Sequence, residues 1–488
     1  RLGTPRTGGA MAMAVRSHTS IALAARGSRP RRASSTRAAA LQPARSLRLA
    51  APPSAARAPA WHAPAPQPPR SALGSLVVCR TSSAGVPEPE PEPEPAVPAP
   101  PAAAGAPATI GDMVYGALDA GLGSIVLLAA TALSLWLANH GTFGPTYIHM
   151  WEYHVGPAFL GLKLSLHEWV NEGLMSLFFF AVGLEIKREF VAGSLASLKK
   201  AALPCLAALG GMVVPMAAYI GLNLGAQGQL AGWAIPMATD IAFAMGVYNF
   251  FRNRMPPGVA AFLLTLATVD DLGAIVVIAT CFAGSVSLPF MAGAAASTAA
   301  LVAMERTKTD NVPLLAALGA CLWYCLLKGG INADVAGVVT ALAVPASAMA
   351  PEGSKAPPEE PGHPPTMMDH LIHWWAPLTA LVIMPLFALA NTAVYLDPSH
   401  LAALPKLPVA QGIAAGLLIG KPLGITALSL LSIKLKLASW PTGMDVRHLL
   451  TCGLLGGIGF TMSLFLIEMS LTGVTAASAK LAIIAASV

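Results

Sequence analysis

The sequence predicts an all-α polytopic membrane protein with about twelve transmembrane helices, two of them discontinuous. The first observation is composition: of the 488 residues, 55% are hydrophobic and only 11% are charged. The mean hydropathy of the chain is +0.62. The second observation is length, since many apolar runs are long enough to cross a bilayer as helices. The third is that two of these runs are interrupted.

Hydropathy places about twelve spans along the chain, the last cut short by the end of the sequence. Their centres lie near residues 130, 178, 213, 241, 270, 296, 320, 340, 383, 421, 458 and 482. Loops after even-numbered spans carry twelve Lys and Arg residues, whereas the opposite loops carry three, Lys163, Lys328 and Lys406. Because positive loops stay on the inner side, the N-terminus and the loops after even-numbered spans are predicted to face the stroma, matrix or cytosol.

The N-terminal region has a different composition from the rest of the chain. Residues 1–80 hold thirteen of the thirty Lys and Arg residues and no Asp or Glu, as in a transit peptide. Residues 77–79, Val-Val-Cys, resemble the end of a chloroplast transit sequence, although mitochondrial presequences share most of this composition. Residues 81–118, rich in Pro, Glu and Ala, predict a disordered linker. The membrane domain is expected at 119–488, and both ends look incomplete because the chain lacks an initial Met and stops within an apolar run.

The formal charge of the whole chain, +6, comes from this leader. Beyond residue 80 the chain carries 17 basic and 24 acidic residues, a net charge of −7. The basic composition therefore does not indicate a nucleic-acid partner. The six cysteines form no CxxC pair, and those in apolar segments read as small buried hydrophobic residues, so neither a disulfide nor zinc is inferred.

Two predicted spans contain residues that break helices. Residues 234–240, Ala-Ile-Pro-Met-Ala-Thr-Asp, include Pro236, which removes a backbone donor, and residues 456–459 are Gly-Gly-Ile-Gly. Broken helices are tolerated at membrane depth only where they line a cavity, and a pair in corresponding positions of two halves points to a transporter binding site. The three-span blocks at about 202–282 and 408–488 fit an inverted repeat.

Asp270 and Asp271 lie inside the apolar run 260–279. Each ionised side chain at mid-membrane costs roughly 2.5–3.5 kcal/mol on insertion scales, so the pair needs water, a cation or a partner. As helix neighbours they point about 100° apart and need not share one partner. Lys421, the thirteenth residue of the 25-residue run Val409–Ile433, is the candidate base because a snorkelling lysine belongs near a helix end.

Asp240 and Thr239 directly follow the first break. The Asp240 carboxylate could neutralise the N-termini of half-helices that meet at a crossing, or it could only cap a short helix. The Thr239 hydroxyl suits a hard cation, although Thr in membrane helices often bonds its own backbone.

Two further clusters of charged residues could lie at the protein surface without a function as readily as they could form a functional site. One is the end of the second span, Gly183–Glu189, and the other is Asp369, His370 and His373 at the inner end of the ninth span. The first reads equally as a solvated interfacial face. The second could sense pH or could be ordinary surface groups.

Five segments resemble signatures of the NhaA-type Na+/H+ antiporters, and they follow one another in the same order. They are VGLEIKREF, ATDIAFAMGV, LATVDDLGAIVVIA, LLIGKPLGI and GGIGFTMSLF, within residues 120–488. The resemblance implies that Asp271 carries the cation and the proton, with Thr239 as a nearby ligand. It also implies that Asp270 pairs with Lys421. The fold it implies consists of inverted repeats with two crossing discontinuous helices, with the charge at the crossing compensated by Asp240.

The same resemblance implies an inner pH-response cluster made of Glu185, Arg188, Glu189, Asp369, His370 and His373. Glu172 falls on the cation path, where members often carry Asp. Asn332 stands where well-known members carry a histidine linked to pH response, and Asp334 adds a carboxylate, so the activation pH is not predicted. Residues 141–168 lie where bacterial members have a dimer-forming hairpin, which implies a homodimer although this sequence differs.

These features lead us to expect a secondary antiporter rather than an enzyme. It would exchange Na+, and in addition Li+, for H+ in the lipid bilayer of an organelle, without a cofactor, for pH and sodium homeostasis. The chloroplast inner envelope or thylakoid is favoured over the mitochondrial inner membrane. A passive cation channel stays open, distinguished by whether proton movement is obligatory. An intramembrane aspartyl protease needs facing aspartates in YD and GxGD contexts, but no YD occurs here and Asp270 and Asp271 are adjacent.

Overall fold

The computed structural model describes residues 115–118, 121–309, 311–346 and 365–487. The predicted transit peptide, 1–80, and most of the predicted linker, 81–118, lie outside these residues. Residues 115–118 are helical, although the sequence places them in the linker. Tyr115 stacks on His373 with ring centroids 3.9 Å apart, and its hydroxyl donates to the His373 carbonyl at 2.8 Å.

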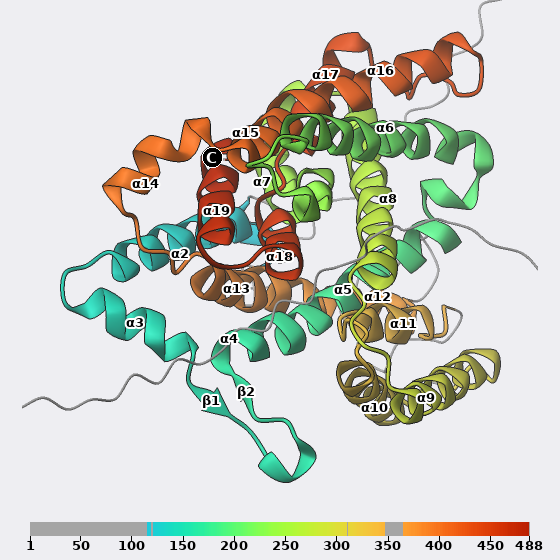
Figure 1. Cartoon of the computed structure of the whole chain (residues 1–488). Helices are drawn as coiled ribbons and strands as arrows, with labels where there is room; N and C mark the ends of the chain where they lie inside the picture. Colours follow the sequence, from blue (N-terminus) through green and yellow to red (C-terminus); the bar gives the residue numbers. More distant parts are fainter. Residues whose placement is uncertain (1–114, 119–120, 310, 347–364, 488) are drawn as a thin grey trace, which may run out of the picture. The chain divides into compact units, whose positions relative to one another are not determined.

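The described chain is almost entirely helical, as the composition predicts (Figure 1). The α-helices are α2 (Leu122–Ala138), α3 (Phe143–Trp151), α4 (Leu166–Glu168), α5 (Met175–Val191), α6 (Leu198–Asn223), α7 (Ile241–Phe251), α8 (Pro257–Cys281), α9 (Leu288–Arg306), α10 (Val312–Gly329), α11 (Val335–Leu342), α12 (Met367–Leu378), α13 (Met384–Asn391), α14 (Pro398–Ala403), α15 (Pro408–Ala415), α16 (Lys421–Lys434), α17 (Val446–Gly456), α18 (Phe460–Ser470) and α19 (Gly473–Ser487). A two-stranded antiparallel hairpin joins α3 to α4, with β1 (His154–Val155) paired to β2 (Leu164–Ser165) so that His154 lies opposite Ser165.

Eight helical segments are long and apolar enough to cross a membrane, and two bent pairs raise the number to ten among the described residues. The bent pairs are α2 with α3, at 119°, and α17 with α18, at 44°. Each of the twelve predicted span centres falls in a helix or in a break between two helices. The shortfall from twelve reflects length: α11 has 8 residues and α19 has 15, so neither alone meets the length of a full span.

Three spans contain a π-helical turn that widens the helix locally. The turns are Trp169–Leu174 between α4 and α5, Thr379–Ile383 between α12 and α13, and Gly416–Gly420 between α15 and α16. Such turns add one residue to the helical register and are common at functional sites. The first contains Glu172, and the third directly precedes Lys421.

The two predicted three-span blocks both appear as a long helix, a broken helix and a further helix. Their long helices, α6 and α16, run side by side (Figure 1). Gly210 and Gly424 make this approach close, because a Cβ on either would lie 2.1 Å from the other residue's carbonyl oxygen. Small residues allow such close contacts between membrane helices. The packing fixes the position of Lys421, one turn before Gly424.

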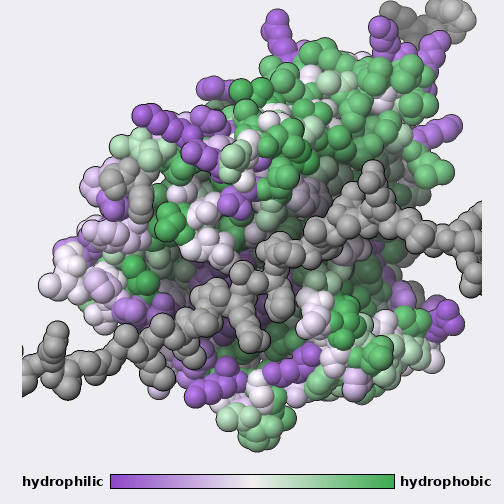
Figure 2. All heavy atoms as spheres, viewed as in Figure 1, coloured by the Kyte–Doolittle hydropathy of each residue, from purple (hydrophilic) through white to green (hydrophobic). Residues whose placement is uncertain are grey.

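The outer surface of these helices is apolar. Figure 2 shows hydrophobic side chains gathered over the upper part of the view, where α6, α16 and α17 lie. Exposed residues there include Leu209, Val213, Leu423, Leu431 and Leu454. An apolar face of this extent on helices of spanning length is what contact with lipid requires, and the chain is an integral membrane protein.

Candidate ion-exchange site

The two broken helices meet at their breaks. In the first, a 3₁₀ segment, Leu230–Met237, leads through extended backbone at Asp240 into α7. In the second, residues 457–459 separate α17 from α18. The backbone N–H of Asp240 donates to the Ile458 carbonyl at 2.8 Å, so the breaks satisfy each other's backbone. Gly459 permits the crossing, since a Cβ there would lie 2.9 Å from the Ala238 carbonyl oxygen.

Asp240 is bonded to the N-terminus of a half-helix on each side of the crossing. Its Oδ1 accepts from the Phe243 N–H of α7 at 2.9 Å. Its Oδ2 accepts from the Thr461 N–H of α18 at 3.1 Å and from the Thr461 hydroxyl. Both N-termini carry partial positive charge, which a carboxylate stabilises. The side chain therefore does more than cap α7, and it lies where the resemblance places the charge compensator.

Lys421 is buried, with 1% of its surface exposed, and is bonded to groups from the first block. Its ammonium donates to Asp270 Oδ2 at 2.7 Å and to the Met237 carbonyl at the end of the 3₁₀ segment. The positive charge thus meets both a carboxylate and the partly negative carbonyl end of a half-helix. The Thr239 hydroxyl lies 2.6 Å from the same Asp270 oxygen and 2.8 Å from the Gly456 carbonyl. The sequence placed Thr239 beside the cation; here its hydroxyl contacts Asp270.

Asp271 differs from its neighbour in its bonding: the Oδ1 of each aspartate lacks a hydrogen-bond partner among the described residues, but Asp270 Oδ2 is bonded to Lys421 and Thr239. Asp271 is 1% exposed. The charged groups that act on it are Asp270, Glu185, Asp240 and Lys421, three acids and one base. An excess of negative charge around a buried carboxylate favours a bound cation, whether a proton or a metal ion. No group of three or more His, Cys, Asp or Glu side chains in the described part of the chain could hold a metal ion.

The inner end of α5 holds its charged residues in local contacts. Glu189 Oε2 accepts from the Ser194 N–H at 3.0 Å and lies 3.5 Å from the Thr265 hydroxyl of α8. Arg188 and Glu189 are the charged groups that act on Glu185. Glu185 in turn acts on Asp271, so the predicted inner cluster and the site are electrostatically connected.

The residues predicted to lie opposite, on α12, also have structural contacts. Asp369 is buried and forms a capping box, its Oδ2 accepting from the Thr366 N–H at 2.9 Å and from the Thr366 hydroxyl at 2.7 Å. The His373 ring stacks on Tyr115, and His370 is the neighbouring charged group that acts on it. Helix α12 packs against α5, and both contribute to one hydrophobic cluster.

Glu172 and Asn332 lie at the opposite end of α5 from Glu185. Glu172 is in the π-helical turn, where its carbonyl accepts from Trp323 Nε1 at 2.8 Å. Asn332 Oδ1 accepts from the Asp334 N–H at 3.0 Å, and its amide nitrogen lies 3.0 Å from the Met469 sulfur of α18. Asn332 therefore shapes the turn into α11 and contacts the second broken helix.

Four of the five signature segments thus meet at the crossing, while the fifth, at the inner end of α5, acts on Asp271 through Glu185, and comparison with known proteins explains why. The family described as Na+/H+ antiporter 1 matches residues 118–488. The chain belongs to this family. The Na+/H+ antiporter NhaA of Cronobacter sakazakii is 42% identical over 371 residues, 75% of this chain and 91% of that protein. The antiporter NhaA 2 of Shewanella denitrificans is 40% identical over 350 residues, 71% and 84% of the two chains.

A solved archaeal structure is also similar. It is the sodium proton antiporter MjNhaP1 of Methanocaldococcus jannaschii, which matches 77% of this chain and 98% of its own at 14% identity, with a TM-score of 0.37.

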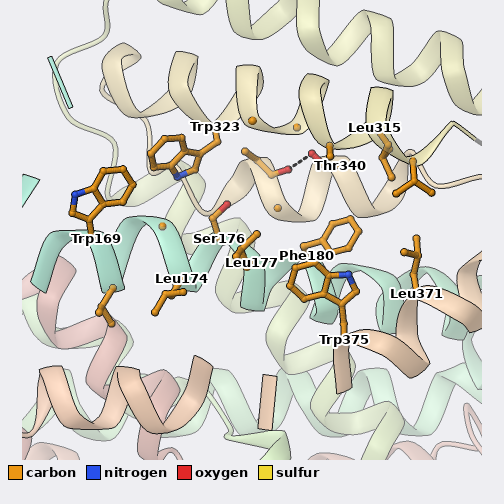
Figure 3. A pocket seen from close by; sticks show the side chains of 18 of the residues that line it. Trp169, Leu174, Ser176, Leu177, Phe180, Leu315, Trp323, Thr340, Leu371 and Trp375 are labelled. Carbon is orange, nitrogen blue, oxygen red and sulfur yellow. Dashed lines mark hydrogen bonds between the residues drawn. The ribbon is translucent and has the colours of Figure 1, made fainter. Parts of the chain in front are cut away.

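A large cavity in this family member lies away from the carboxylates. Its volume is about 620 Å³, and its walls come from α5, α10, α11 and α12 (Figure 3). Trp169 and Trp323 stack at one end with ring centroids 6.0 Å apart, and Phe180 and Trp375 lie toward the other. The Thr340 hydroxyl on its wall donates to the Ala336 carbonyl at 2.7 Å. With so few free polar groups, this cavity does not suit a hydrated cation.

Sequence reasoning missed two residues that this antiporter fold uses. Thr461 bridges the crossing to Asp240, and the signal was a hydroxyl two residues after the second break. Lys187 donates to Glu305 Oε1 at 2.5 Å and to the Leu342 carbonyl at 2.5 Å, joining α5 to α9 and α11. Nothing in its local sequence separates Lys187 from a solvated interfacial residue.

Proposed function

We propose that the protein is a secondary active antiporter that exchanges Na+ for H+ across a membrane, with Asp271 as the carrier. The observation that carries the proposal is the contrast between two adjacent buried carboxylates. The Oδ1 of each is unpartnered, but Asp270 Oδ2 is bonded to Lys421 and Thr239, whereas no basic residue in the described part of the chain forms an ion pair with Asp271. Family membership supports the ions, since the relatives are named Na+/H+ antiporters. A buried carboxylate without a protein partner needs a cation, and protons and sodium ions then exclude each other.

The residues around Asp271 have distinct roles in this mechanism. Lys421 neutralises Asp270, so that one net negative charge is left for the transported ion. Asp240 and Lys421 neutralise opposite ends of the half-helices, which allows short helices and free backbone at membrane depth. The backbone at the breaks makes few helical hydrogen bonds. It can therefore rearrange there as the site opens to alternate sides. Carbonyl groups freed there, such as that of Gly456, are oxygen ligands of the kind a hard cation prefers.

The other assigned roles remain part of the proposal. Glu172 would lie on the cation path from the outer side. The inner pH-response cluster would consist of Glu185, Arg188, Glu189, Asp369, His370 and His373. Support for it comes from the electrostatic connection between Glu185 and Asp271 and from the packing of α12 against α5.

We place the protein in an organelle membrane, with the chloroplast favoured by the composition of residues 1–80. Li+ is the additional substrate proposed. A homodimer formed through the β1–β2 hairpin is supported by exposed apolar residues there: Phe159 is 87% exposed and Tyr153 is 69% exposed. Such residues on a projecting hairpin are available to a second copy.

Replacement of Asp271 by Asn tests the carrier role directly. Asn keeps the shape of the side chain but can neither bind sodium by charge nor carry the proton. We expect sodium-driven proton flux in proteoliposomes to fall to the level of empty vesicles, while the variant inserts and folds as the wild type does.

The matched control is Asp445→Asn. Asp445 is the exposed N-cap of α17, where its Oδ1 accepts from the His448 N–H at 3.1 Å, and this bond lowers the pKa of Asp445. Because Asn also caps helices, this control should keep full flux. Substantial flux in Asp271→Asn would exclude Asp271 as the carrier. Sodium entry without proton exit in the wild type would favour a channel.

A further inference from the structure

Asp334 is a second buried carboxylate without a partner, and it lies outside the crossing. It is 2% exposed, and neither Oδ1 nor Oδ2 has a hydrogen-bond partner among the described residues. Although Asp334 stands at the N-cap of α11, it makes no side-chain capping bond. Neither a cap nor an ion pair therefore accounts for an acidic residue at this buried position. A carboxylate so placed needs a proton or a metal cation.

Glu172 brings a second carboxylate to the same place. The Glu172 side chain lies near the backbone of Ala333, the residue before Asp334. Its charge is also the one that acts on Asp334. The π-helical turn Trp169–Leu174 sets the direction of this side chain, and α5 packs along α11. Two acidic groups from separate helices thus lie near each other, and no basic residue in the described part of the chain acts on either.

The position of Asp334 connects this pair to the crossing. Asp334 lines a small gap between α5, α8 and α11, together with Ile275 and Ile278. These isoleucines follow Asp271 by four and seven residues, so all three lie on one face of α8. Asp334 is therefore adjacent to the helix face that carries Asp271, about two helical turns away along α8.

On the other side, the pair leads toward a polar cavity. Glu168 is the further carboxylate that acts on Glu172, and it lines a cavity of about 370 Å³ with Glu152, His154, His167 and Lys480. The positive-inside asymmetry places this end of α5 on the outer side. Carboxylates at 168, 172 and 334 thus form a file from the outer cavity toward the α8 face of Asp271.

We propose that Asp334 and Glu172 form a second site for a monovalent cation, at which a sodium ion pauses between the outer cavity and Asp271. The two carboxylates supply oxygen ligands and the charge that a buried sodium ion needs. This site rests on the proposed exchange function, but its binding can be measured without transport. It assigns a role to Asp334, which the resemblance to other antiporters leaves unexplained.

Sodium-dependent thermal stabilisation of the purified full chain in detergent tests the site. The Tm is compared in sodium chloride and in choline chloride at equal ionic strength and at a pH where carboxylates are ionised. Ligand that binds only the folded state raises the Tm. We expect Asp271→Asn to retain part of the sodium-dependent rise, and the Asp271→Asn, Asp334→Asn double variant to lose it. Asp334→Asn should fold, because it removes an unpaired buried charge.

Transport supplies an independent measurement of the same site. Asp334→Asn alone and Glu172→Gln alone should each raise the half-maximal sodium concentration for proton flux by about tenfold, because each removes one charged ligand of the bound sodium ion. Asp445→Asn, which removes an exposed charge outside these carboxylates and their cavity, is the control and should change neither quantity.

The outcomes separate the second site from the proposed function. If Asp271→Asn alone abolishes all sodium-dependent stabilisation, or the double variant keeps it, the second site does not exist. Failure of the exchange function would instead appear as flux that survives Asp271→Asn, whatever the effect on thermal stabilisation.

Discussion

The crossing of the broken helices and the inner end of α5 both gather charged side chains, but they use them differently. At the crossing, deep in the apolar core, Asp240 is bonded to the N-termini of α7 and α18, and Lys421 is bonded to the Met237 carbonyl at the end of the 3₁₀ segment. At the inner end, Glu189 and Asp369 are bonded to nearby backbone N–H groups of their own loop or helix start. The first set holds distant segments together, whereas the second shapes local turns.

The difference teaches how to separate a transport site from a structural charge cluster in this molecule. In the inner cluster, the carboxylates of Glu189 and Asp369 have structural partners. At the crossing, Asp240 and Asp270 are compensated by helix N-termini and by Lys421, but no ion pair compensates Asp271, whose Oδ1 has no hydrogen-bond partner among the described residues. We therefore expect substitutions at the crossing to affect stability and transport strongly, and substitutions at the inner caps to affect stability slightly.

The largest effect on stability is expected from Lys421→Ala. This change leaves Asp270 charged and unpaired in the core, where removing one partner of a buried pair typically costs about 3–5 kcal/mol. Asp270→Asn should partly rescue it, since it removes the uncompensated charge. All four proteins of this double-mutant cycle can be compared by thermal unfolding in detergent. Additive losses would show that the 2.7 Å contact contributes no coupling.

A smaller effect is expected at the other compensator. Thr461→Val removes the hydroxyl that donates to Asp240 but keeps the backbone N–H bond of the same residue. Loss of one hydrogen bond to a buried charged group costs about 1.5–3 kcal/mol. Flux should fall as well, because the crossing is less well ordered. Thr451→Val on α17, where the hydroxyl donates to the Arg447 carbonyl of the same helix, is the matched control. An unchanged Tm would mean that backbone groups alone compensate Asp240.

The smallest effect is expected at the inner cap of α12. Thr366→Ala removes the hydroxyl of the capping box and should lower stability by about 1 kcal/mol. The half-maximal sodium concentration should stay as in the wild type, because the Asp369 carboxylate is kept and lies outside the crossing. A higher half-maximal sodium concentration in Thr366→Ala would instead connect this cap to the transport site and would weaken the contrast between the two regions.

Much of the crossing is predictable from sequence because its signals are local. Pro236 and the glycines at 456–459 mark the breaks, and acidic or basic residues inside apolar runs mark Asp270, Asp271 and Lys421. The bond between Asp240 and Thr461 joins residues 221 positions apart, and its existence depends on how the two breaks cross.

Other features depend on packing that no local pattern records. Lys187 looks like an interfacial lysine until α9 supplies Glu305 and α11 supplies a carbonyl. Asp334 looks like an ordinary helix cap until the structure shows it without a capping bond. Hydropathy also gives no indication that α11 is shorter than a full span.

The central claim is that sodium and protons compete for the carboxylate of Asp271, and a pH series measures this competition directly. Half-maximal sodium concentrations for proton flux are determined in proteoliposomes across the range in which transport switches off. Because only the ionised carboxylate binds the metal, apparent sodium affinity should fall about tenfold per pH unit below the pKa of that group and level off above it. A sodium affinity that stays constant with pH throughout that range would contradict competition at one site.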